Sequence, residues 1–169
     1  MDEHRLGLKP ILRRVWARKG QRPRAIVRPR YTWCYLYGFV HPRTGRTLWW
    51  LLPTVRIDVF SLALAELAAE LGLDAEHRVV LVLDQAGWHA SAKVVVPEGL
   101  DLVFLPPYSP ELQPAERLWS LSDAVLVNRC FEDLDELIEV QAEQCRALTR
   151  QPDRVVGRTA YHWWVEDVA

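Results

Sequence analysis

The stretch from Arg78 to His89 most constrains the fold, because it places an acidic residue at the end of a buried strand. Five apolar residues, Val79 to Leu83, are too few for an ordinary helix and are rich in β-branched valine. This pattern predicts a strand that is covered on both faces. Asp84 follows at its carboxyl end, where open α/β sheets present their ligand-binding side chains. Asp84 is therefore the first candidate for chemistry.

The remaining patterns predict a single domain, residues 1–169, with a mixed α/β sheet flanked by helices. Two aromatic, β-rich runs around a Pro/Gly turn predict an antiparallel hairpin. Two apolar strands joined by a short crossover are expected to be parallel neighbours. The expected strands are 2–8, 31–40, 47–53, 79–84 and 102–105, and helices are expected at 58–71, from residue 114 onward and at 133–148.

Three carboxylates can converge if strand 2–8 lies beside the strand that ends at Asp84. Asp2 begins the first strand, and Glu116 points out of the core from the first turn of the helix that starts at Pro114. Carboxylates without a Cys or His cluster suit Mg²⁺ or Mn²⁺. Each acid also has a structural alternative: Asp84 as a turn cap, Glu116 as a first-turn carboxylate favoured by the helix dipole, and Asp2 as a frayed terminus.

Charge is distributed unevenly along the chain. Residues 1–30 contain ten Lys and Arg and two acidic residues, so they carry +8 in a chain of net charge −1. Lys and Arg displace counterions from a phosphate backbone, so this arm predicts nucleic-acid binding, or alternatively a solvated basic loop. Trp16 is expected to anchor the arm on the body. The candidate phosphate contacts are Arg13, Arg14, Arg18, Lys19, Arg22 and Arg24.

Cysteine usage and hydropathy predict a soluble intracellular protein. Cys34, Cys130 and Cys145 are odd in number and far apart, which indicates reduced thiols. The sequence has no run of 18 apolar residues and no apolar signal-peptide segment at its start.

Two motifs closely resemble the second and third acidic motifs of bacterial insertion-sequence transposases in the Tc/mariner-like DDE superfamily. They are LDQAGWH at 83–89 and LPPYSPELQPAERLW at 105–119, and DEHR at 2–5 resembles the first motif. The stretch LPPYSPELQPAE is highly specific. The resemblance continues through 128–131 to the aromatic residues at 161–164, so it covers essentially the whole chain.

This resemblance implies an RNase-H-like fold in which Asp2, Asp84 and Glu116 form a catalytic triad that holds two Mg²⁺ (or Mn²⁺) ions. The implied activity is hydrolysis and strand transfer at transposon ends, with double-stranded DNA as partner and the bacterial cytoplasm, at the nucleoid, as location. His89 matches a motif histidine and is expected to support a metal ligand or contact the DNA backbone. A turn-stabilising hydrogen bond is its alternative role.

Several positions depart from the family pattern. Gln85 and Gln113 stand where Asn is usual, and Gln is the poorer helix N-cap. Asp123 lies where a basic residue is common. The family carries DNA-binding modules and the rest of the first strand before the first acid. We therefore expect the chain to lack both, to dimerise or pair with an upstream-frame DNA-binding polypeptide, and to pack its tail, 158–169, on the domain.

Two other functions fit the residues. The chain could be a catalytically incompetent module that binds nucleic acid or a partner through its basic arm and aromatic hairpin. It could also be another RNase-H-like nuclease, one that cuts RNA–DNA hybrids.

Overall fold

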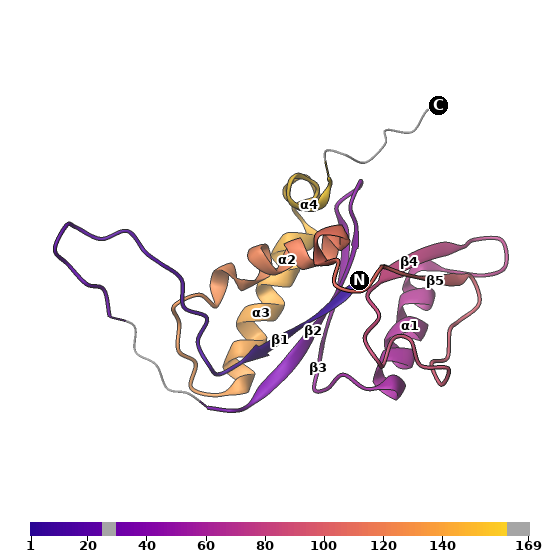
Figure 1. The fold of residues 1–169 in the computed structure, drawn as a ribbon, viewed down its shortest axis with the longest axis horizontal. Coiled ribbons are helices and arrows are strands. Elements are labelled where there is room, and N and C mark those ends of the chain that lie inside the picture. The colour runs from indigo at the N-terminus through magenta and orange to yellow at the C-terminus, as the bar shows by residue number, and fades with distance from the viewer. Residues whose placement is uncertain (25–29, 162–169) are drawn as a thin grey trace.

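The computed structural model describes residues 1–24 and 30–161 (Figure 1). The strands are β1 (Asp2–Gly7), β2 (Trp33–His41), β3 (Arg46–Leu52), β4 (Val79–Leu83) and β5 (Leu100–Phe104). The helices are α1 (Ile57–Leu71), α2 (Pro114–Ser122), α3 (Leu134–Thr149) and α4 (Pro152–Thr159), with 3-10 turns at Pro110–Leu112 and Asp123–Val125.

The strands confirm the predicted hairpin and the predicted parallel pair. β1, β2 and β3 form an antiparallel sheet in that order, with Asp2 opposite Gly38, and β4 and β5 pair in parallel. The two sheets meet at the start of β1, where the Met1 amino group donates a hydrogen bond of 2.7 Å to the Val82 carbonyl. β1 therefore begins beside the end of β4, and this junction brings Asp2 toward Asp84.

Side chains alternate along β2 between two hydrophobic cores. Cys34 and Leu36 pack with helices α2, α3 and α4 on one face of the antiparallel sheet. Tyr37 and Phe39 pack with α1 and β4 on the other face. Figure 1 shows this arrangement, with α1 and the parallel strands on one side of the long antiparallel sheet and the other helices opposite.

Helix α2 differs from the predicted orientation. We expected Trp119 and Asp123 to lie off the core face, yet both are buried. Trp119 is covered because α2 contacts β1 and β2 on one side and α3 and α4 on the other. Asp123 lies in the 3-10 turn after α2, where it pairs with His4 and Arg13. Gly38 makes room for this packing, because a Cβ there would lie 2.8 Å from the Trp119 ring.

Smaller differences concern helix boundaries. Helix α4 was not predicted; Pro152 starts it at a position that suits a fixed φ and a missing N–H. The N-cap of α1 is Arg56 rather than Asp58, which lies in the first turn and pairs with Arg56 at 2.6 Å. Gly72 ends α1 in the left-handed region, as expected, with φ of 63°.

The basic arm leaves the body after β1 and forms the long loop at one end of Figure 1. Trp16 does not anchor it, because its side chain is fully exposed. Residues 25–29 of the arm and 162–169 of the aromatic tail lie outside the described residues. Within the described part of the chain, no helix is long and apolar enough to cross a membrane.

Candidate active site

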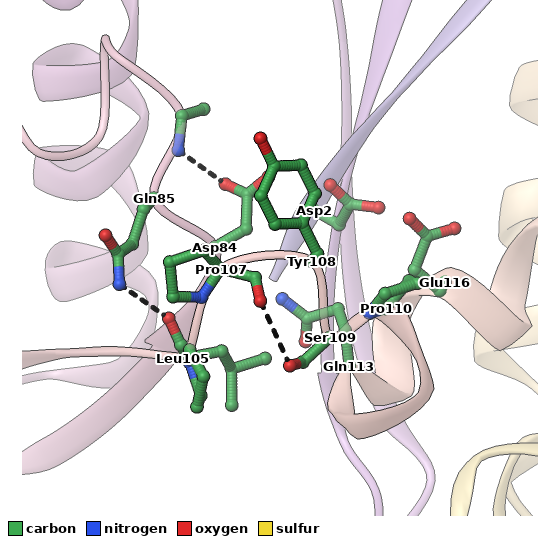
Figure 2. Close-up of a pocket in the computed structure, with 12 residues that line it drawn as sticks. Asp2, Asp84, Gln85, Leu105, Pro107, Tyr108, Ser109, Pro110, Gln113 and Glu116 are labelled. Carbon is green, nitrogen blue, oxygen red and sulfur yellow. Dashed lines mark hydrogen bonds between the residues drawn. The ribbon is translucent and has the colours of Figure 1, made fainter.

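Asp2, Asp84 and Glu116 line the same open pocket, which has a volume of about 490 Å³ (Figure 2). β1, the end of β4, the loop after β5 and helix α2 each contribute to its wall. In residues 1–24 and 30–161, no three His, Cys, Asp or Glu side chains are grouped closely enough to hold a metal ion. The three carboxylates therefore share a pocket without converging on one point.

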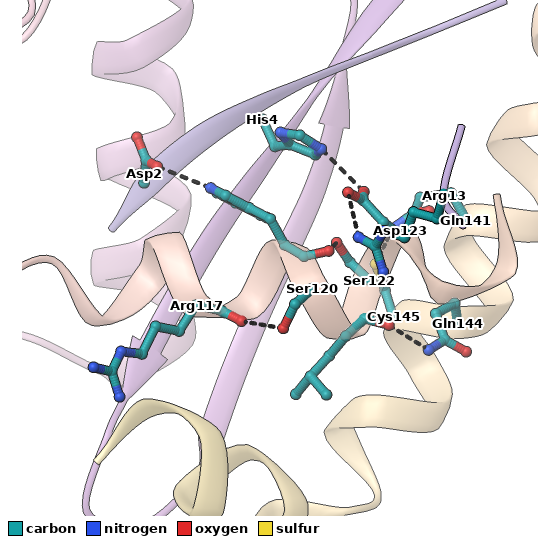
Figure 3. A network of polar contacts seen from close by, with 12 residues as sticks. Asp2, His4, Arg13, Arg117, Ser120, Ser122, Asp123, Gln141, Gln144 and Cys145 are labelled. Atoms are coloured by element: carbon teal, nitrogen blue, oxygen red, sulfur yellow. Dashed lines mark hydrogen bonds and ion pairs between the residues drawn. The ribbon is translucent and has the colours of Figure 1, made fainter. Parts of the chain in front are cut away.

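Asp2 is held in place by helix α2. The indole Nε1–H of Trp119 donates a hydrogen bond of 3.0 Å to its Oδ2 atom, as the network in Figure 3 shows. Burial, and to a lesser extent the neighbouring Glu116 carboxylate, raise the pKa of Asp2 to about 7, against the lowering effect of the Trp119 hydrogen bond. Like charges thus crowd one another at this wall of the pocket.

Asp84 follows β4 and is fixed by two hydrogen bonds to Oδ1. The Ala86 amide donates one of 3.1 Å, and the Nδ1 atom of His89 lies at 2.7 Å. Asp84 therefore caps its turn, as its structural alternative proposed, while its carboxylate also faces the pocket. His89 is buried, and its Nε2 atom lies 2.9 Å from Oε1 of Glu3.

Glu116 lies in the first turn of α2 and is exposed, as predicted. The loop before this helix is shaped by prolines and by Tyr108, whose φ of 57° is unusual for a residue with a side chain. The two glutamines that depart from the family pattern brace the same region. Gln85 donates to the Leu105 carbonyl at 2.9 Å, and Gln113 donates to the Met1 carbonyl at 2.8 Å.

Both glutamine contacts use the length of the side chain. Gln113 makes no capping hydrogen bond at the start of α2, which agrees with its expected weakness as an N-cap. Its amide instead ties the first residue of the chain to the helix that carries Glu116. Gln113 and Gln85 therefore position the walls of the pocket.

The predicted phosphate contacts fall into two groups. Arg13 is held against the body, because it pairs with Asp123 at 3.6 Å and its backbone bonds to the Asn128 side chain. Asp123 is itself buried and bonds to His4 at 3.0 Å, so it does not present a bare negative charge to a ligand (Figure 3). The other cations are exposed along the arm; they are Arg14, Arg18, Lys19, Arg22 and Arg24.

The residues of the pocket suit a divalent cation. Carboxylate oxygens are the ligands that Mg²⁺ and Mn²⁺ prefer. Burial, and to a lesser extent the Glu116 carboxylate, raise the pKa of Asp2, and a bound positive charge would favour its ionised form. Asp2, Asp84 and Glu116 are the residues that would hold it once their carboxylates close on the ion, since the described residues do not group them that closely without one.

An antiparallel sheet joined to a parallel pair and flanked by helices, with acids at the strand ends, is an RNase H-like α/β architecture. The profile of the family described as DDE superfamily endonuclease matches residues 1–138. The chain therefore belongs to the DDE superfamily of endonucleases.

Several known proteins are similar to this chain in sequence or in fold. The Sinorhizobium fredii (strain NBRC 101917 / NGR234) protein described as uncharacterized protein y4pE/y4sA is 37% identical over 132 residues, which are 78% of this chain and 96% of that protein. The Mos1 mariner paired-end complex with Mn has a similar fold, with a TM-score of 0.61 at 16% identity. The pre-cleavage Mos1 transpososome gives a TM-score of 0.60 at 15% identity. Each of these two structural matches covers 96% of this chain and 55% of the solved transposase, so the chain spans about half the length of those proteins.

Sequence reasoning missed two residues behind the pocket: Trp119, which bonds to Asp2, and Glu3, which contacts the His89 ring. A signal for Glu3 was available, because adjacent residues of a strand point to opposite faces. Asp2 and Glu3 therefore face different cores. Trp119 lies three residues after Glu116 on the same helix, a spacing that places both side chains on neighbouring parts of its surface.

Proposed function

We propose that residues 1–169 form the catalytic domain of a DNA transposase that hydrolyses phosphodiester bonds at transposon ends and transfers the cut strand. The observation that carries this proposal is that Asp2, Asp84 and Glu116, distant in sequence, line one pocket. Family membership supports the reaction class. Tyr161 belongs to the same domain, because it is buried and its ring centroid lies 4.1 Å from the Arg117 guanidinium.

In this proposal the three carboxylates hold two Mg²⁺ or Mn²⁺ ions. When bound, such ions supply Lewis acidity for an attacking water or 3′-hydroxyl and for the leaving oxygen. Trp119 keeps one oxygen of Asp2 in a fixed direction, and the Ala86 amide does the same for Asp84. Preorganised ligands of this kind reduce the reorganisation needed when metal and DNA bind.

Metal binding and nicking by the full chain test the proposal. We expect saturable Mn²⁺ binding by calorimetry and Mn²⁺-dependent nicking of supercoiled plasmid. Glu116→Gln should abolish nicking, whereas Glu139→Gln, which removes an exposed acid on α3, should leave it unchanged. Wild-type protein that binds no Mn²⁺ would favour the alternative of a catalytically incompetent binding module. Faster cutting of an RNA–DNA hybrid than of duplex DNA would favour the other nuclease.

We also propose that the chain forms homodimers. β2 continues past the last residue paired with β1, and β4 is paired with β5 on one side. A pocket of about 340 Å³ lies between these strands and α1, so strand edges are open to another chain. Light scattering after size exclusion should give twice the mass of 19.6 kDa. A strict monomer at high concentration would contradict this expectation.

A further inference from the structure

Three polar side chains in contact, Glu3, His89 and Asp84, connect the protein interior to the candidate active site. The His89 ring lies between two carboxylates, with Nδ1 at 2.7 Å from Asp84 and Nε2 at 2.9 Å from Glu3. The side chains of His89 and Glu3 are only 1% and 3% exposed, whereas that of Asp84 is 56% exposed. Glu3 and His89 are therefore held in the interior, and Asp84 lies at the pocket.

The contacts of the three side chains determine how the His89 ring is oriented. Each ring nitrogen lies within hydrogen-bonding distance of a carboxylate oxygen, so the ring is held at both nitrogens. The buried Glu3 carboxyl group would lose this polar partner without the ring, and a buried polar group without a hydrogen bond is costly. The Phe60 ring packs against the imidazole with centroids 4.6 Å apart, which restricts its rotation. The position of Glu3 thus determines the orientation of the His89 ring.

The consequence falls on one oxygen of Asp84. Oδ1 accepts the bonds from His89 and from the Ala86 amide, so the carboxylate plane is set and Oδ2 is the oxygen offered to a cation. Glu3 is also the immediate neighbour of Asp2 on β1. A contact from Glu3 through His89 therefore couples the placement of two pocket acids that lie on different strands.

We infer that Glu3 and His89 form a positioning pair that orients the Asp84 carboxylate toward bound metal and ties β1 to the end of β4. This inference rests on the proposed function. Groups that hydrogen-bond to metal ligands from behind change metal affinity by about 10- to 100-fold when removed. Neither residue of the pair lines the pocket itself.

The test compares Mn²⁺ binding by three variants of the full chain. Glu3→Ala should weaken the affinity about 10-fold or more, and Glu3→Gln, whose amide oxygen still accepts from Nε2, should recover most of the loss. Leu67→Ala removes a buried side chain of the same core away from the ring and should lower thermal stability with the affinity unchanged. Wild-type affinity in Glu3→Ala, or an equal loss in Leu67→Ala, would overturn the inference.

A metal-free readout separates this inference from the proposed function. If wild-type protein binds no Mn²⁺, the proposed function fails. The NMR signals of the His89 ring ¹⁵N atoms then test the contact between Glu3 and His89 on their own. A hydrogen-bonded Nε2 atom in wild type, and loss of that bond in Glu3→Ala, support the positioning geometry. Identical ring signals in the two proteins would refute it.

Discussion

At the scale of single residues, opposing effects set the pKa of Asp2 in the pocket. Burial and the Glu116 charge disfavour its ionised form, while the Trp119 hydrogen bond favours it, and the pKa settles at about 7. Asp2 is therefore a carboxyl group whose protonation changes near neutral pH. A ligand of this kind responds strongly to any nearby positive charge.

The raised pKa of Asp2 makes the metal-free chain less stable as pH rises. The pKa of Asp2 in the folded chain lies above its ordinary value of 3.8. The stabilising contribution of Asp2 to the free energy of unfolding is therefore fully present below pH 3.8 and is lost as pH rises through about 7. Asp2→Asn should therefore raise the free energy of unfolding more at pH 8 than at pH 5, by on the order of 2 kcal/mol after allowing for solvent screening.

Urea denaturation in EDTA at the two pH values measures the difference. The comparison between variant and wild type cancels the titration of groups that the substitution does not affect. An equal effect at pH 5 and pH 8 would show that Asp2 has an ordinary pKa in the folded chain.

At the scale of elements, the packing of α2 on β2 decides the geometry of the site. Helix α2 supplies both Glu116 and the indole that holds Asp2, and it reaches β2 only because Gly38 has no side chain. An alanine Cβ would lie 2.8 Å from the Trp119 ring. The ring or the strand must then move, and both are fixed by a close-packed core.

Gly38→Ala should therefore destabilise the fold by about 1–3 kcal/mol, the usual cost of overpacking. Gly157→Ala is a matched control, because it lies in helix α4 with nothing within 4 Å of the added Cβ. That control should be neutral or stabilising by up to about 1 kcal/mol, since alanine is the better helix former. Chemical denaturation reports both values, and a neutral Gly38→Ala would mean that α2 is free to shift.

At the scale of the whole molecule, positive charge is separated from the pocket acids. The first thirty residues carry +8, while the rest of the chain carries −9. Five exposed cations lie on the long arm seen in Figure 1, whereas Arg13 is paired to the body through Asp123. These exposed cations can be replaced without disturbing the folded sheet, so they suit a test of the proposed DNA contact.

Replacing Arg18 and Arg22 by Gln should weaken duplex DNA binding and reduce the salt dependence of its affinity. Removing one phosphate contact lowers the slope of log K against log salt by about 0.9. Arg150 and Arg154, which are exposed near the end of α3 and in α4, provide a matched double replacement with the same charge change. Fluorescence anisotropy at several salt concentrations measures the slopes, and equal slopes for the two variants would rule out a special role for the arm.

Much of this architecture could be predicted from local patterns. The apolar run before Asp84 predicted β4, the paired aromatic runs predicted the hairpin, and Pro114 predicted the start of α2. These predictions held because each depends on residues close in sequence, where backbone preference and side-chain period act directly. The burial of Trp119 and Asp123 was predicted wrongly, since it depends on β1, β2 and the arm, which are distant from both residues in sequence.

The sequence by itself determined the elements, the family and which carboxylates to consider, because propensity, periodicity and motif spacing are written along the chain. Only the tertiary structure decided how those carboxylates are held: Trp119 against Asp2, Gln113 against Met1, and His89 between Glu3 and Asp84. The physical reason is that a hydrogen bond requires two groups within about 3 Å. Such groups, distant in sequence, reach that distance only when separate strands and a helix pack together.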